Sequence, residues 1–336
     1  MEAERELTLH GEEPRYARGW QRLAEGTWAW LQPNGRLGES NAGLIAGAGE
    51  ALQVDTLWDL RLTGRMLAEM RALGAPAPGT VFNTHSDGDH VWGNQLLPEA
   101  RIVSTTAAKR LMTLDTPSEM RRLQRLGRVV GGTGRDLNRF DWSEVELTLP
   151  RETFEGRLRL DVGGRAVELI EVGPAHTGGD AVAWVPDVAV CFAADVLFIG
   201  ATPIAWAGPV TAWLAALDRV CALGARAYVP GHGPVCGQAE VDELRRYLEW
   251  VRDEGTPQLR QGVSPRKAAQ RMLASEEFAA SPWAEWDDPE RLVVTLATER
   301  FRLRGGEGHL TGAGRLRAVL QMQRVAKALQ KPSGSG

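Results

Sequence analysis

Residues 85–90 have the sequence HSDGDH, which places two imidazoles and two carboxylates within six consecutive positions. They directly follow the run TVFNT, whose composition is typical of a short buried strand. Such a density of charged and polar groups is unfavourable unless a cation lies among them, and Gly88 frees the backbone of the loop. Imidazole and carboxylate together suit zinc, iron or manganese. We therefore predict a metal-binding loop at the end of a strand.

Three further candidate ligands also follow apolar, strand-like runs. His176 lies in GPAHTGGD after AVELIEV, Asp195 follows VAVCFAA, and His232 lies in VPGHGP after ARAYVP. A single histidine in a loop is seldom a metal ligand, but the repeated placement after strands is not expected by chance. We therefore predict that these three residues complete the site that residues 85–90 begin.

The spacing of apolar residues predicts two sheets with outer helices. Runs at 27–31, 42–47 and 51–55 are separated by Gly, Asn and Pro turn signals, which indicates an antiparallel opening. A helical pattern that ends at Gly74 precedes the strand at 80–84, so a β-α-β order begins there. From residue 157 the pattern returns to strands, with a helix before the last of them, and after about residue 237 it becomes helical.

In this order of motifs the sequence resembles the metallo-β-lactamase superfamily, whose members carry HxHxDH, then a His, an Asp and a final His. The resemblance covers residues 27 to 240 and implies an α/β fold, an αβ/βα four-layer sandwich of two mixed β-sheets with outer helices. It also implies two divalent metal ions, with zinc expected from the family. The seven implied metal ligands are His85, Asp87, Asp89, His90, His176, Asp195 and His232. By the resemblance, His85 and His176 bind the first metal, Asp89, His90 and His232 the second, and Asp195 bridges the two.

Asp87 departs from the family pattern, which has a histidine at this position. As a ligand, Asp87 gives each metal two histidines and one terminal carboxylate, and this hard ligand favours iron or manganese over zinc alone. Flavodiiron proteins of the same superfamily also have a carboxylate here, although their flavodoxin domain has no counterpart in this chain. The other interpretation is a solvated Asp87 beside a single metal, because Asp-Gly loops are also ordinary turns.

The resemblance implies a hydrolase in which a metal-bridging hydroxide attacks a small ester, thioester, lactone or lactam. Two cations lower the pKa of such a water to roughly 7. Asp89, and after it Asp87, are the candidate catalytic proton acceptors. Asp55, and Thr177 with Asp180, are expected to orient ligand histidines by hydrogen bonds. The alternative function is a non-haem diiron oxidoreductase or oxygenase on the same fold, motivated by Asp87.

The domain division follows the motifs. Residues 1–240 are expected to form the catalytic domain, with 104–145 as a helical, lid-like insertion broken by a mobile GGTG. Residues 241–330 are expected to form a helical extension packed on the core, and 331–336 a disordered tail. Tryptophans of the extension are expected to anchor it to the core, and a contact between two copies of the chain, as in a homodimer, is the alternative.

Composition excludes several classes of function. The formal net charge of −4 and the lack of a basic cluster near the motifs argue against a nucleic-acid partner, so the expected partner is a small-molecule substrate. The charged N-terminal residues do not resemble a secretory signal, and no run approaches the roughly 20 apolar residues that span a bilayer. We therefore expect a cytoplasmic protein with no membrane contact. Trp206 and Trp213 are rim candidates, whereas His10 and His309 match no motif and are expected at the surface.

Overall fold

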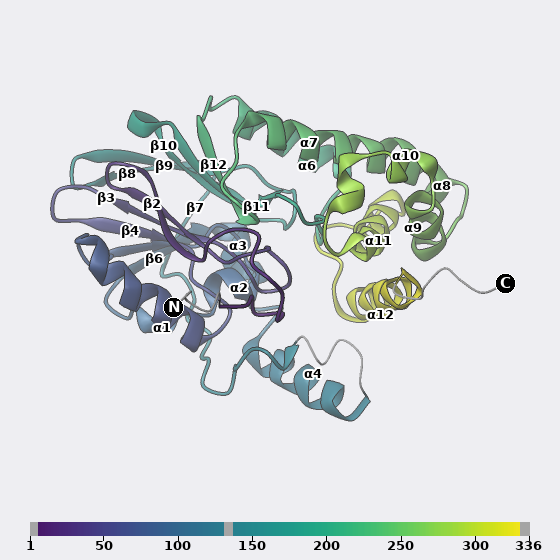
Figure 1. Ribbon diagram of the computed structural model, residues 1–336, viewed down its shortest axis with the longest axis horizontal. Coiled ribbons are helices and arrows are strands. Elements are labelled where there is room, and N and C mark those ends of the chain that lie inside the picture. The colour runs from purple at the N-terminus through teal and green to yellow at the C-terminus, as the bar shows by residue number, and fades with distance from the viewer. Residues whose placement is uncertain (1–5, 131–136, 330–336) are drawn as a thin grey trace, which may run out of the picture.

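Two β-sheets lie face to face at the centre of the fold, and helices cover their outer sides (Figure 1). The computed structural model describes residues 6–130 and 137–329. The first sheet has seven strands in the order β1 to β7, antiparallel from β1 to β4 and parallel from β4 to β7. Its strands are β1 (Gly19–Ala24), β2 (Thr27–Leu31), β3 (Ala42–Ala46), β4 (Ala51–Val54), β5 (Thr80–Phe82), β6 (Arg101–Thr105) and β7 (Glu152–Phe154).

The second sheet has five strands in the order β12-β11-β10-β9-β8. Only the β11–β12 pair among them is parallel. The strands are β8 (Arg157–Val162), β9 (Arg165–Glu171), β10 (Ala181–Val185), β11 (Val190–Phe198) and β12 (Ala227–His232). Both sheets are therefore mixed, which confirms the predicted αβ/βα sandwich.

Apolar side chains fill the space between the sheets. Phe82 of the first sheet and Leu169 and Phe192 of the second belong to one buried cluster. The sheets approach so closely that a Cβ atom on Gly43 would lie 2.1 Å from the ring of Phe192. Burial of such residues is the main favourable contribution to folding, at about 25 cal/mol for each Å² of apolar surface.

Helices connect the strands and extend the chain beyond the second sheet. The first group comprises α1 (Leu60–Met70), η1 (Arg71–Leu73), α2 (Gly88–Val91), η2 (Asn94–Leu96), α3 (Thr106–Leu111), α4 (Pro117–Val130), η3 (Pro186–Val188) and α6 (Val210–Cys221). The C-terminal group comprises α7 (Gln238–Trp250), the π-helical turn η4 (Val251–Gly255), α8 (Thr256–Arg260), α9 (Pro265–Leu273), α10 (Glu276–Ala279), η5 (Pro282–Glu285), η6 (Pro289–Arg291), α11 (Leu292–Leu303) and α12 (Gly312–Leu329). The predicted C-terminal helical extension is therefore present.

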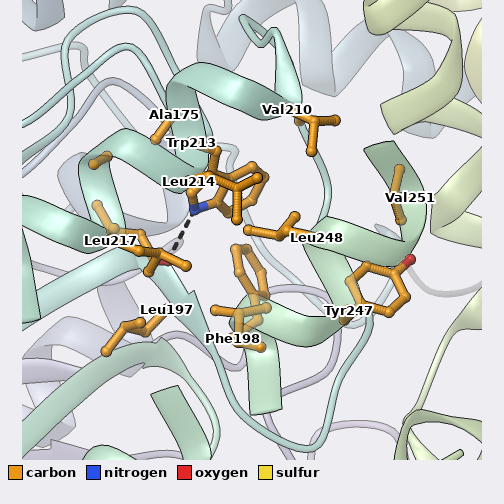
Figure 2. Close-up of a cluster of buried hydrophobic side chains, with 14 of the residues drawn as sticks. Ala175, Leu197, Phe198, Val210, Trp213, Leu214, Leu217, Tyr247, Leu248 and Val251 are labelled. Carbon is orange, nitrogen blue, oxygen red and sulfur yellow. Dashed lines mark hydrogen bonds between the residues drawn. The ribbon is translucent and has the colours of Figure 1, made fainter. Parts of the chain in front are cut away.

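A second buried cluster joins the outer face of the second sheet to these helices (Figure 2). Phe198 of β11 and Trp213 of α6 pack in it with Leu248 of α7, and the Trp213 indole donates a hydrogen bond to the carbonyl of Val196 (3.0 Å). Trp283 belongs to the same cluster and is 8% exposed. The apolar contacts therefore continue across residue 240, and the domain boundary placed there stays a prediction.

The structure differs from the predicted elements in three strands and in one segment. Strands β1, β6 and β7 were not predicted: β1 is half-buried without clear alternation, and β7 has only three residues. The 104–145 segment contains the helices α3 and α4, but it starts in β6, which ends at Thr105, and near its end Phe140 and Trp142 pack on Trp58, with ring centroids 4.5 and 5.1 Å away. This aromatic contact holds the end of the segment in the core without a helix. The lid-like role of the segment stays a prediction. The predicted GGTG break and the predicted tail lie outside the described residues.

Among the residues that the structure describes, no helix is both long and apolar enough to cross a bilayer.

Candidate metal centre

The HSDGDH loop leaves the end of β5 and starts the short helix α2. Asp87 occupies the N-cap position with extended dihedrals, and Gly88 is the first helical residue. A Cβ atom on Gly88 would lie 2.5 Å from the ring of Trp92, which is itself buried. The glycine is therefore required by the packing of Trp92 and not by the unusual backbone conformation expected from the sequence.

The structure brings the predicted ligands together in two groups. The first consists of His85, Asp87 and His176, and the second of Asp89, His90 and His232. Within each group the candidate ligand atoms lie within 4.8 Å of one another. Each group has two imidazoles and one carboxylate, as the sequence pattern predicted.

Asp195 lies between the two groups, within β11 and not after it. Its Oδ2 atom is 3.4 Å from Nε2 of His176 and 3.7 Å from Nε2 of His232, and its Oδ1 atom is 3.1 Å from Nε2 of His90. A Cβ atom on Gly231 would lie 1.8 Å from Oδ1 of Asp195, so a glycine is needed beside this carboxylate. This position between histidines of both groups is consistent with the bridging role that the family resemblance implies.

Hydrogen bonds set which imidazole nitrogen faces the centre. His90 donates from Nδ1 to Asp55 (2.9 Å), and His176 donates from Nδ1 to the carbonyl of Ile204 (2.5 Å). Nδ1 of His85 lies 3.0 Å from the Thr84 hydroxyl, which donates to Asp55 (2.7 Å) and so accepts from the ring. In all three histidines Nδ1 carries a proton, so Nε2 is the nitrogen that faces the centre and would bind a metal once it is deprotonated.

Asp55 and Asp180, which were predicted to orient ligand histidines, form hydrogen bonds with different groups. Asp55 contacts the ring of His90 directly and also accepts a hydrogen bond from the Thr84 backbone (2.8 Å). Asp180 accepts hydrogen bonds from the backbone N–H groups of Ala175 (3.0 Å) and Thr177 (2.9 Å). Asp180 with Thr177 therefore shapes the loop that carries His176. The ring itself is oriented by the carbonyl of Ile204, which no sequence motif marks.

Buried polar atoms without partners show that the centre suits metal ions. Nε2 of His85, Nε2 of His90 and Oδ1 of Asp195 are buried and form no hydrogen bond with any described residue. Leaving such atoms unpaired costs about 1–3 kcal/mol each, and more for a charged group. Lone pairs of imidazole and carboxylate that converge in this way are the donors that zinc and iron take. The residues present therefore fit a metal centre.

The charges of the centre depend strongly on one another. Burial, with the neighbouring His90, lowers the pKa of His85 to about 4. Burial also opposes the charge on His176, but Asp195 and Asp87 outweigh it and raise the pKa of His176 to about 10. Burial disfavours ionised Asp195 too, yet the surrounding histidines hold its pKa well below the usual range. The carboxylates thus stay ionised and demand positive charge beside them, as bound cations would supply.

Three residues near the centre lie where the sequence did not place them. Trp213 is fully buried in the second core cluster and is not at the rim. His309 is half-buried, and its Nε2 accepts a hydrogen bond from the backbone of Gly178 (2.6 Å), two residues after His176. Arg315 of α12 stacks on Trp206, with 3.9 Å between the guanidinium carbon and the ring centroid. Neither His309 nor Arg315 belongs to a motif, so the local sequence carried no signal for them.

The matches to known proteins agree with this fold and site. The family model of the metallo-beta-lactamase superfamily matches residues 35–232, and the chain belongs to that superfamily. A metallo-beta-lactamase family protein from Thermus thermophilus has a TM-score of 0.60 at 20% identity, over 84% of this chain and 95% of its own. A metallo-beta-lactamase from Pontibacter korlensis has a TM-score of 0.51 at 16% identity, over 69% of this chain and 99% of its own. These structures support the fold.

Two curated relatives are named as hydrolases. Hydroxyacylglutathione hydrolase of Methylococcus capsulatus is 26% identical over 219 residues, which are 63% of this chain and 70% of the relative. Linear primary-alkylsulfatase of Pseudomonas sp. is 27% identical over 142 residues, which are 39% of this chain but only 26% of that protein. Together with the superfamily match and the His/Asp cluster, they identify the chain as a metal-dependent hydrolase of the metallo-beta-lactamase fold.

Proposed function

We propose that the chain is a dinuclear hydrolase that acts on a small ester, thioester, lactone or lactam. The observation that supports this most directly is the pair of ligand groups, each of two histidines and one aspartate, with the carboxylate of Asp195 between them. Two divalent ions held there would supply an activated water with a pKa of roughly 7 and a Lewis acid for the attacked oxygen. Zinc is the metal we expect from the family, and Asp87 makes iron or manganese the alternative.

Asp89 and Asp87 are the residues that we assign to proton transfer. Their side chains are 15% and 18% exposed, whereas that of Asp195 is 4% exposed, so the first two face the open side of the centre. Oδ2 of Asp89 lies 3.5 Å from His232, while Oδ2 of Asp87 lies within hydrogen-bond distance of His176 at 3.1 Å. The looser contact leaves Asp89 the freer proton acceptor, and it ranks first for that reason.

A thioester is the first substrate class to test. The support is the relative named hydroxyacylglutathione hydrolase, which aligns with 63% of this chain. The test combines elemental analysis of the untreated protein with hydrolysis assays on matched ester, thioester, lactone and lactam substrates. Two metal equivalents and turnover of at least one class are the expected result. A single metal equivalent in fully active protein would contradict the dinuclear centre.

A non-haem diiron oxidoreductase or oxygenase is the second candidate function, and Asp87 is the observation that favours it. With His85 and His176, Asp87 forms a set of two histidines and one carboxylate, which is also the facial set of non-haem iron enzymes. The same sample separates the two functions. Iron, visible absorption that changes on reduction, and oxygen uptake would support the second, whereas colourless zinc protein that hydrolyses a thioester would support the first.

A further inference from the structure

Arg315, in helix α12, places its positively charged guanidinium on the side of the metal centre that carries Trp206. Its guanidinium stacks on Trp206, and its side chain is 23% exposed. It also forms an ion pair with Asp115, which lies in the connection between α3 and α4 and is 34% exposed. Arg315 therefore joins the C-terminal helices to the 104–145 segment, on one side of the centre.

Backbone contacts fix this rim relative to the ligand His176. Trp206 donates a backbone hydrogen bond to the carbonyl of His176 (2.8 Å) and accepts one from Leu310 (2.9 Å). His309 accepts a hydrogen bond from Gly178 of the same loop (2.6 Å). Trp206, on which the guanidinium stacks, is thus tied by its backbone to the ligand His176.

Within the described ranges, Asp115 is the one carboxylate that lies at ion-pair distance from Arg315.

We propose that Arg315 determines substrate specificity by binding a carboxylate of the substrate beside the scissile bond, in exchange for Asp115. The inference deepens the proposed hydrolase function and rests on it. Asp115 already shows that a carboxylate fits against this guanidinium. Both side chains of the pair keep some exposure to solvent, 23% for Arg315 and 34% for Asp115, so a substrate carboxylate can reach the guanidinium and take the place of Asp115. Arginine suits this role because its planar fork binds carboxylates while one face stacks on an aromatic ring.

Two variants that break the same ion pair provide the test, because binding and purely structural roles predict different signs. In Arg315→Gln the substrate carboxylate loses its partner, whereas in Asp115→Asn the guanidinium loses its competitor. The hydrolysis probes are thioesters whose sulfur carries a carboxymethyl, carboxyethyl or carboxypropyl group. Each is compared with the probe in which an uncharged amide replaces the carboxylate. We expect Arg315→Gln to raise KM about ten- to a hundredfold for the carboxylate probe that the natural protein binds best. This is the effect of losing a hydrogen bond to a charged group. We expect Asp115→Asn to lower that KM, and neither variant to change KM for the amides.

A binding measurement separates this inference from the proposed function. Calorimetry on the metal-loaded protein with the corresponding thioethers, which cannot be hydrolysed, reports affinity even if no thioester is a substrate. Weaker binding of the acid thioether in Arg315→Gln, partial recovery in Arg315→Lys and tighter binding in Asp115→Asn would support the carboxylate site. Equal changes for acids and amides, or the same sign in Arg315→Gln and Asp115→Asn, would show that the ion pair is only structural and overturn the proposal.

Discussion

Asp195 is the single carboxylate that contacts histidines of both ligand groups among the described residues, so its removal should affect both metal positions. We expect Asp195→Ala to retain one metal equivalent and to lose activity by more than about a hundredfold. Loss of a group that only supports a metal ligand costs up to about a hundredfold, and loss of a ligand itself should cost more. Elemental analysis and steady-state kinetics on the same preparation measure both effects. Full activity with two metal equivalents would rule out the bridging role.

Asp55 acts through His90, because it accepts the Nδ1 proton of that imidazole at 2.9 Å. Asp55→Asn keeps the shape but removes the charge that fixes the ring, and we expect metal affinity at the second group to fall by about 10- to 100-fold. Competition with a chelator measures that affinity. Asp180→Asn is the matched control, since Asp180 is also buried and accepts hydrogen bonds from a ligand loop without contacting an imidazole. Equal losses of affinity in both variants would show that Asp55 has no specific role.

The loop between α11 and α12 is attached to the His176 loop by His309, and this contact should depend on pH. Burial lowers the pKa of His309 to about 4, and its Nε2 must be unprotonated to accept the Gly178 hydrogen bond. A histidine with a lowered pKa in the folded state stabilises the fold above its unfolded pKa of about 6.5 and loses that contribution as pH falls toward 4.

His309→Gln retains an acceptor but does not titrate, so it isolates this effect. We expect the free energy of unfolding of the natural protein to fall relative to the variant between about pH 6.5 and 4, as measured by denaturant unfolding at each pH. Because the metal ligands titrate in both proteins, their contribution cancels in the difference. A difference that is constant with pH would contradict the assigned protonation state.

At the scale of the whole molecule, we expect metal binding and folding to be coupled, because three carboxylates are gathered in one centre. The ligand groups come from both sheets, so cations bound there would tie the sheets together. Removal of the metals by a chelator should lower the Tm, and each ion contributes about 4 kcal/mol when free metal exceeds its Kd a thousandfold. Thermal unfolding with and without chelator measures the shift. The Asp195→Ala protein should show a smaller difference, since it holds fewer ions.

The sequence by itself determined the candidate ligands, their chain order and the sandwich. Those features are local: HSDGDH lies in one loop after β5, and apolar runs with turn signals mark the buried strands. Short strands such as β7 escaped detection because three residues carry too little periodicity.

Only the tertiary structure decided which distant residues orient the ligands and which reach the rim. Arg315 and Asp115 are 200 positions apart, and Asp55 precedes His90 by 35. Such pairs arise from the packing of helices and sheets on a common core, and a solvent-exposed arginine has the same local sequence signal as one stacked on Trp206. The physical reason is that hydrophobic periodicity specifies which face of an element is buried, whereas the partner of that face depends on how the whole chain packs.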